Sequence, residues 1–208
     1  MSPSVFFDVN CKKCPRINKF LKVNRLKFPD YYNRPVPSIG PLHADLLVVG
    51  LAPGLHGGNA TGQTFFGDFS GEFLFNTLYD IGFLERKYSK SKFEDYELIN
   101  CRITNVCKCV PPKNRLLSSE IKNCSSYLQA EIFPISRKVI VCLGTVSHTV
   151  VHKMLGIRGQ KFMHGKIFRI YNTLIFDSYH PSKLNVNTGV LTRKMLSELF
   201  WNVKYRLS

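Results

Sequence analysis

DLLVVGLAPGLHGGNATGQTFFGDFSG, residues 45–71, joins a short apolar segment to a long loop that is dense in glycine. Residues 45–50 have the continuous apolar character of a buried strand. Glycines let a backbone approach a ligand closely and adopt positive φ, and Pro53 stiffens the turn out of the strand. Ser70 is expected to cap a helix that follows the loop. The pattern therefore indicates an active-site loop between a strand and a helix.

Strands and helices alternate along the rest of the chain. We expect further strands over 98–105 and 138–144, and two short strands within 165–177. We expect the helices after residue 70 to cover Phe73 to Ile81, a segment from about Ser118, residues 144–155, and Thr192 to Tyr205, with a loop over 178–189. This order predicts an α/β fold, a three-layer α/β/α sandwich around a small, mainly parallel central sheet. Ligands of such folds bind at the carboxyl ends of the strands.

The length and composition fit one globular domain over residues 1–208. The 208 residues are 44% hydrophobic and 12% aromatic, which excludes a disordered chain. Residues 1–40 are basic, and Pro15, Pro29, Pro35 and Pro37 predict an irregular segment without a long helix, held by something other than a core. No apolar run approaches a membrane span, and no secretion signal is visible, so we expect a cytoplasmic protein without a membrane partner.

The positive charge is concentrated at the two ends of the chain. Residues 1–40 and 150–208 together hold 18 Lys and Arg against 4 acidic residues, whereas residues 41–149 hold 11 against 10, within a net charge of +15. A near-neutral middle between basic flanks suggests a docked polyanion, with nucleic acid first and a membrane surface second. General solubility is the alternative explanation.

The chain has seven cysteines and no visible secretion signal, which indicates metal or cluster binding rather than disulfides. Cys11 and Cys14 form a pair with a two-residue gap, and Cys109 and Cys124 follow much later with 14 residues between them. The other three, Cys101, Cys107 and Cys142, lie in apolar segments and are interpreted as small buried side chains.

Several motifs together resemble the uracil-DNA glycosylase superfamily, and within it the family 5 (type B) enzymes. They are Gly50-Leu-Ala-Pro-Gly54, His56-Gly-Gly-Asn59, Thr61-Gly62, Phe65-Phe-Gly-Asp68, Ser70-Gly71, Cys109-Val-Pro-Pro-Lys-Asn114, and Ser178-Tyr-His-Pro-Ser182 with Asn185 and Thr188-Gly189. Each motif alone is weak. Their joint order, across nearly the whole chain, is a strong signal.

The resemblance implies that Cys11, Cys14, Cys109 and Cys124 bind a [4Fe-4S] cluster that ties residues 1–40 to the body. Zinc bound by cysteines alone is the physical alternative, because four thiolates also suit a tetrahedral zinc ion. Four unliganded cysteines are the remaining possibility. We expect a structural role for the cluster.

The resemblance also implies a pocket for an extrahelical base. Gly54 and His56 are expected near the substrate, and the Phe65 ring is expected to stack on the base, although Phe66 could exchange roles with it or Phe65 could belong to the core. Either Asn105 or Asn114 could read the base edge, because a carboxamide offers a donor and an acceptor together. The two alternatives stay open at this point.

His180 would act as a neutral donor that stabilises charge growing on the uracil O2 atom. Beyond it, Lys183 could meet a phosphate, Leu184 could enter the emptied stack, and Asn185 is expected in the same DNA contact.

The water activator is harder to assign, because Leu51 and Ala52 stand where superfamily members with an acid in the first motif place it. Asp68 is the best remaining carboxylate, with Asn59 able to position a water; Asp68 could instead cap the following helix.

These residues predict a monomeric, monofunctional DNA repair glycosylase, associated with the nucleoid through DNA. It would hydrolyse the N-glycosidic bond of uracil, and the family resemblance adds hypoxanthine and other deaminated bases. The alternative is a catalytically silent iron–sulfur protein that binds nucleic acid. A phosphate-binding nucleotide enzyme is disfavoured, since residues 50–71 lack the P-loop ending and the Gly-x-Gly-x-x-Gly spacing.

Overall fold

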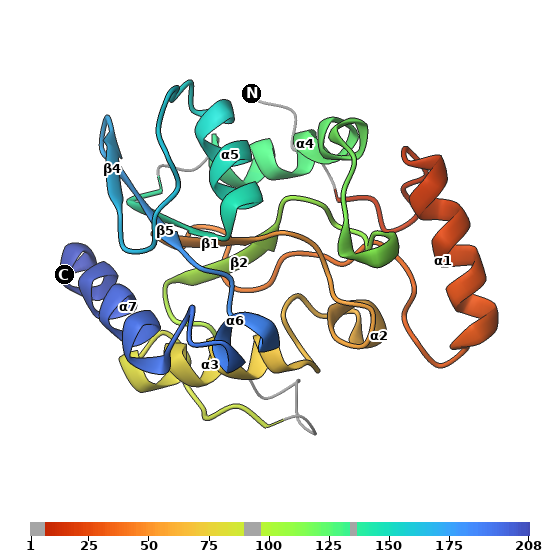
Figure 1. The fold of residues 1–208 in the computed structure, drawn as a ribbon, viewed down its shortest axis with the longest axis horizontal. Helices are drawn as coiled ribbons and strands as arrows, with labels where there is room; N and C mark the ends of the chain where they lie inside the picture. Colours follow the sequence, from red (N-terminus) through yellow and green to blue (C-terminus); the bar gives the residue numbers. More distant parts are fainter. Residues whose placement is uncertain (1–6, 90–96, 134–136) are drawn as a thin grey trace.

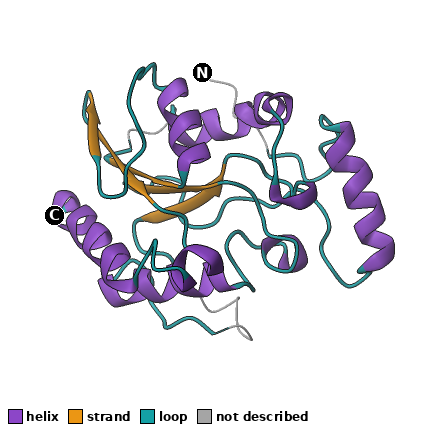
Figure 2. Ribbon diagram, viewed as in Figure 1, coloured by secondary structure: helices purple, strands orange, loops and turns teal. Residues whose placement is uncertain are grey.

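A five-stranded sheet forms the centre of the molecule in a computed structural model that describes residues 7–89, 97–133 and 137–208 (Figures 1 and 2). Its strands are β1 (Leu46–Gly50), β2 (Cys101–Asn105), β3 (Val139–Leu143), β4 (Ile167–Ile170) and β5 (Thr173–Ser178). The strand order is β2-β1-β3-β5-β4, and β4 alone runs antiparallel. The predicted small, mainly parallel sheet is therefore confirmed.

Helices cover both faces of this sheet. They are α1 (Pro15–Lys27), α2 (Gly58–Thr61), α3 (Phe69–Ile81), α4 (Ser118–Ile132), α5 (Thr145–Met154), α6 (Lys183–Asn187) and α7 (Arg193–Leu207), with a 3₁₀ turn at Pro112–Asn114. Figure 1 shows α4 and α5 above the sheet, α3 and α7 below it, and α1 at one side. The three-layer α/β/α architecture is confirmed.

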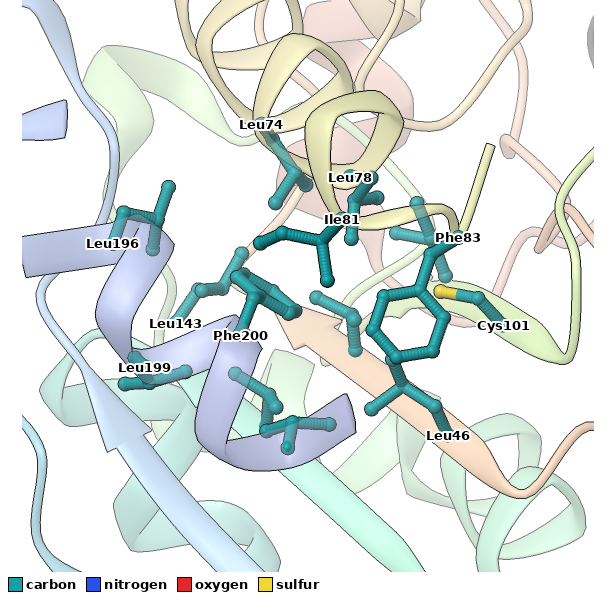
Figure 3. Close-up of a cluster of buried hydrophobic side chains, with 14 of the residues drawn as sticks. Leu46, Leu74, Leu78, Ile81, Phe83, Cys101, Leu143, Leu196, Leu199 and Phe200 are labelled. Carbon is teal, nitrogen blue, oxygen red and sulfur yellow. The ribbon is translucent and has the colours of Figure 1, made fainter. Parts of the chain in front are cut away.

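The alternation of side chains along each strand separates two hydrophobic cores. On β1, Leu46 and Val48 face α3 and α7, whereas Leu47 and Val49 face α4 and α5. Figure 3 shows the first of these cores, in which Phe200 of α7 lies among leucines from the facing helix and strands. Both faces are closed, which explains why β1 and β3 contain only apolar residues apart from their glycine and cysteine.

Residues 1–40 differ from the prediction, because their described part contains the 13-residue helix α1. Pro15 stands at the first turn of that helix, where its missing N–H costs no hydrogen bond, so it starts the helix instead of breaking it. Ile17 and Leu21 are buried in a third hydrophobic cluster with Tyr127 of α4, so a core does hold this segment. Residues 1–6 of the predicted segment lie outside the described residues.

Helix boundaries supply two smaller corrections. Asp68, not Ser70, caps α3, because its carboxylate accepts a hydrogen bond from the Gly71 N–H at 3.0 Å. Helix α4 begins at Ser118, as predicted, but Leu117 occupies the cap position and Glu120 accepts a hydrogen bond from its N–H.

The other differences concern β2 and the last loop. Strand β2 starts at Cys101, so it is shorter than the predicted 98–105. The expected loop 178–189 contains the short helix α6, capped by Ser182.

Among the described helices, none has the length and hydrophobicity that crossing a membrane requires.

Replacing Phe200 with alanine should lower the free energy of unfolding by about 3–5 kcal/mol, because the ring is fully buried and its removal leaves a cavity. The neighbouring Trp201 is 55% exposed on the same helix, so Trp201→Ala is a matched control with an expected change below about 1 kcal/mol. Urea unfolding of both variants measures the difference. Equal losses would contradict the packing described for α7.

Candidate active site

A cavity of about 290 Å³ opens at the carboxyl ends of β1, β2 and β5. The parallel strands bring their following loops to the same edge of the sheet, as expected for this fold. The lining residues are Leu51, Ala52, Pro53, Gly54, Gly58, Phe65, Asp68, Ser70, Asn105, Pro111, Asn114, His180 and Ser182. Six of the predicted catalytic and substrate residues thus meet in one place.

The end of β1 has room for this arrangement only because residue 50 is glycine. A Cβ atom on Gly50 would collide with the Phe65 ring and with the side-chain oxygen of Asn105. A Cβ atom on Gly71 would likewise collide with the carbonyl of Phe65. The two glycines therefore let the loop fold back over the strand end and place an aromatic ring beside an amide.

Phe65 lines the cavity and Phe66 does not. Phe65 has φ +59°, an uncommon conformation for a residue with a side chain, and its ring lies 27° from parallel to the His180 ring with centroids 5.9 Å apart. Phe66 instead packs edge-on against Tyr88, with centroids 5.2 Å apart. Of the two neighbouring rings, Phe65 is the one that faces a ligand.

Asn105 and Asn114 both line the cavity but at different depths. Asn105 ends β2, is 2% exposed, and its Oδ1 has no hydrogen-bond partner among the described residues. Asn114 is exposed in the 3₁₀ turn, with φ +53°. A buried amide oxygen without a partner is costly, so Asn105 is the better placed of the two to bind a polar ligand.

His180 follows β5 and is half-buried against the cavity. Burial lowers the pKa of its imidazole to about 4, so the ring is neutral near pH 7. Its backbone carbonyl accepts hydrogen bonds from the Ser182 N–H and from the Asn185 side chain, both at 2.8 Å. These contacts hold the turn that carries the ring.

Asp68 is the carboxylate that lines the cavity, and it also caps α3. Its Oδ2 lies so close to Gly54 and Gly57 that a Cβ atom on either glycine would collide with it. The glycine loop thus wraps the carboxylate. Ser70, predicted only as a cap, lies in the same wall of the cavity.

Two predicted residues lie away from the cavity lining. Asn59 is fully buried, and its Nδ2 donates to Asn33 Oδ1 at 2.8 Å. His56 is exposed, and its Nδ1 lies 3.0 Å from the Tyr31 hydroxyl. Both residues connect the glycine loop to the segment that follows α1.

The three predicted DNA-contact residues belong to α6. Lys183 is exposed, and Leu184 is 71% exposed. Asn185 is half-buried, and its side chain is engaged with the His180 carbonyl. Helix α6 therefore presents one cation and one apolar side chain next to the cavity.

The four predicted ligand cysteines meet between α1 and α4. With Cys107, they line a second, smaller cavity; the four are Cys11, Cys14, Cys109 and Cys124. Burial raises the pKa of the Cys109 thiol, and the other three cysteines raise it further. Four thiols in one place are a ligand set that suits an iron–sulfur cluster or a zinc ion.

Cys107 is buried as predicted, but it lies in this cysteine cluster instead of the main core. Its hydrogen bond to Cys124 is the main reason why the pKa of Cys124 is lowered, to about 7. The backbone N–H of Lys108 also donates to Cys124 Sγ, at 3.3 Å. Both hydrogen bonds therefore favour the thiolate form of Cys124, which is the form that binds a metal.

Arg16 and Glu120 close this region from outside. The guanidinium donates to the carboxylate through Nε at 2.8 Å and Nη2 at 2.7 Å, joining α1 to α4 beside Cys14.

Comparison with known proteins identifies the family. Residues 37–203 match the family model described as the uracil DNA glycosylase superfamily. The chain belongs to the uracil-DNA glycosylase superfamily.

Within this superfamily, the chain is similar to proteins named type-5 uracil-DNA glycosylase. It is 41% identical to the one from Pyrobaculum aerophilum, over 92% of the chain and 86% of the relative. It is 34% identical to the one from Thermus thermophilus, over 93% and 92%. A type-4 uracil-DNA glycosylase from Saccharolobus solfataricus is 30% identical, over 90% and 82%. The resemblance found in the sequence motifs is confirmed.

The lowered pKa of His180 predicts a pH dependence of stability. The unfolded chain protonates a histidine near pH 6.5 and the folded chain only near pH 4, so protons favour the unfolded state between these values. The His180 contribution is complete above about pH 6.5 and is lost as the pH falls towards 4, on the order of 1 kcal/mol after solvent screening. Urea unfolding of wild type and His180→Gln across this range, with NMR titration of the imidazole, checks it. An imidazole that titrates near pH 6.5 in the folded protein would contradict it.

Proposed function

We propose that this protein is a monofunctional uracil-DNA glycosylase that hydrolyses the N-glycosidic bond of uracil and other deaminated bases, hypoxanthine included, and leaves an abasic site. The observation that carries the proposal is the meeting of Phe65, Asn105 and His180 in one cavity. Its type-5 relatives support the same activity. A binding protein without catalysis is not favoured, because binding alone requires no such combination of groups.

Phe65 stacks on the face of the extrahelical base, and Asn105 binds its edge. The orphan Oδ1 of Asn105 accepts the ring N–H of uracil, while its Nδ2 donates to a neighbouring carbonyl. Asn114 at the rim contacts the base or its sugar as it enters. Gly54 and Gly58 leave space for the backbone to approach the substrate.

His180 stabilises the leaving base. A neutral imidazole donates a hydrogen bond to uracil O2 as negative charge grows there, which follows the logic of an oxyanion hole. The pKa of about 4 supports this role, because the ring is then neutral near pH 7. It can donate a hydrogen bond to the anionic base without first losing a proton.

Asp68 is the carboxylate in the cavity lining, so it is the group that we assign to the attacking water. Leu51 and Ala52, in the same wall, have no acid-base chemistry. The departing base leaves a cationic, oxocarbenium-like sugar, so the carboxylate stabilises positive charge and orients a water without full deprotonation. Asn59, buried behind the loop, acts by holding the loop in shape, and His56 supports it from the surface.

Basic and apolar groups around the cavity support DNA as the substrate. Lys183 contacts a phosphate, and Leu184 fills the gap left in the base stack. Beside α1, a groove of about 400 Å³ is lined by Lys12, Lys22, Arg25 and Arg34 and by no acidic residue. The negative charge of a DNA phosphate backbone complements these four basic side chains. No lysine lines the catalytic cavity among the described residues, which supports hydrolysis over Schiff-base lyase chemistry.

A [4Fe-4S] cluster bound by Cys11, Cys14, Cys109 and Cys124 fits the cysteine region. Four thiols converge there, which is the ligand set that such a cluster requires, and the family resemblance favours the cluster over a zinc ion bound by the same thiols. When bound, the cluster supplies cross-links between α1 and the loops around α4. We assign it a structural role, because no cysteine lines the catalytic cavity among the described residues.

An end-labelled duplex that contains one uracil tests the activity. We expect the cluster-loaded protein to produce a strand break at the uracil only after alkali, and no break in an undamaged duplex. His180→Ala should slow single-turnover excision by about 10²–10³-fold, the usual cost of one lost charge-stabilising donor.

His43→Ala changes an exposed histidine outside the cavity lining, so it is the matched control and should keep the wild-type rate. An intact strand with wild type, under conditions where a control glycosylase cleaves, would exclude uracil excision. An unchanged rate for His180→Ala would remove His180 from the mechanism.

Cys124→Ala should remove most of the iron from the purified protein, because one of four thiolate ligands is lost. Cys101→Ala removes a buried cysteine of the main core and should keep about four irons per chain. Iron analysis and the visible absorption of the cluster measure both. Zinc in place of iron in protein purified without air would overturn the cluster assignment.

A further inference from the structure

Three potential metal ligands meet on the opposite face of the sheet from α3 and α7. His148 and His152 are one turn apart on α5, and Asp177 stands on β5 three residues before His180. The ligand atoms of the three side chains all lie within 4.8 Å of one another. Their exposed fractions are 4%, 4% and 0%. None of them lines the catalytic cavity.

His148 pairs directly with Asp177. Its Nδ1 lies 2.8–2.9 Å from the Asp177 carboxylate oxygens, and its Nε2 lies 3.2 Å from the Gln160 carbonyl. Histidines that bind metals commonly donate one ring N–H to a carbonyl and use the other nitrogen for the ion. In the tautomer that donates from Nε2 to Gln160, Nδ1 can share an ion with the carboxylate beside it.

His152 lacks the contacts that a buried histidine ordinarily has. Both of its ring nitrogens are buried without a hydrogen-bond partner among the described residues. Its ring lies 3.9 Å from the His148 ring, centroid to centroid. An unsatisfied buried polar atom destabilises the folded protein, so a ligand that binds one of these nitrogens would remove that cost.

Aromatic side chains enclose the group. Phe168 packs edge-on against His152 at 4.6 Å, and Phe162 packs edge-on against His148 at 5.7 Å. The nearby cation, Lys166, is directed at the Phe168 ring at 4.8 Å and at the Gln160 side chain at 3.4 Å. The two phenylalanine rings limit the access of solvent to the three side chains.

We propose that His148, His152 and Asp177 bind a divalent transition-metal ion, zinc before others. Two imidazoles and one carboxylate form a set that zinc accepts, with a water or a fourth group completing the tetrahedron. Ligand atoms on zinc are about 3.4 Å apart, so small rotations of the two rings close the site. The ion links α5 to β5, and thereby steadies the strand whose end carries His180.

Zinc and iron analysis of the cluster-loaded full chain tests this site. After incubation with zinc and removal of the excess, wild type should hold about one zinc per chain in addition to its iron. His152→Ala should weaken zinc binding at least tenfold while the iron content and the far-UV circular dichroism stay unchanged. The matched control, His43→Ala, alters an exposed histidine and should bind zinc as wild type does.

X-ray absorption at the zinc edge decides the question on wild type alone, should His152→Ala fail to fold. The expected first shell contains only nitrogen and oxygen at about 2.0–2.2 Å. A sulfur shell at about 2.3 Å would place the zinc at the cysteines and overturn the proposal. It is also overturned if wild type binds no zinc, or if a folded His152→Ala binds it as tightly as wild type.

Discussion

The absence of a side chain at Gly50 is the constraint on which the site depends. At this strand end, the Phe65 ring and the Asn105 amide occupy space that a Cβ atom would need. Gly71 meets the same requirement from the other side, where the carbonyl of Phe65 packs. An aromatic face and an amide edge can meet one planar ligand only if both come this close. Packing at the strand end therefore requires glycine at these two positions, whatever chemistry the loop performs.

Buried polar atoms without a partner occur at several places in the described part of the chain. Asn59 directs its Nδ2 at Asn33 within the glycine loop, although its Oδ1 is unpaired. The Asn105 oxygen at the cavity and both nitrogens of His152 on the other face of the sheet are unpaired as well. Stability alone does not explain such atoms, because unpaired burial costs free energy.

Much of the fold follows from the sequence pattern, and the exceptions have physical causes. The apolar runs at β1 and β3 predict buried parallel strands, and the helices after them are found where periodicity predicts them. Helix α1 was missed because a proline at the first turn initiates a helix, whereas the same residue further along would break it.

The sequence indicates which residues line the cavity better than it indicates what each of them does there. Sequence does not reveal that Phe65 adopts positive φ and so turns its ring to the cavity while Phe66 turns away. The depth of Asn105 and the exposure of Asn114 likewise depend on the sheet, since one ends a strand and the other sits in a turn. His148 and His152 meet Asp177 from a distant segment of the chain, so no local motif predicts that the three side chains are close together.

Helix α6 has a mechanical consequence. Ser182 caps it, and Asn185 reaches back to the carbonyl of His180, so the five-residue unit from His180 to Leu184 is braced at both ends. The turn that carries the imidazole and the helix that carries the exposed Leu184 are therefore joined by the same two hydrogen bonds, so neither can shift without straining the other.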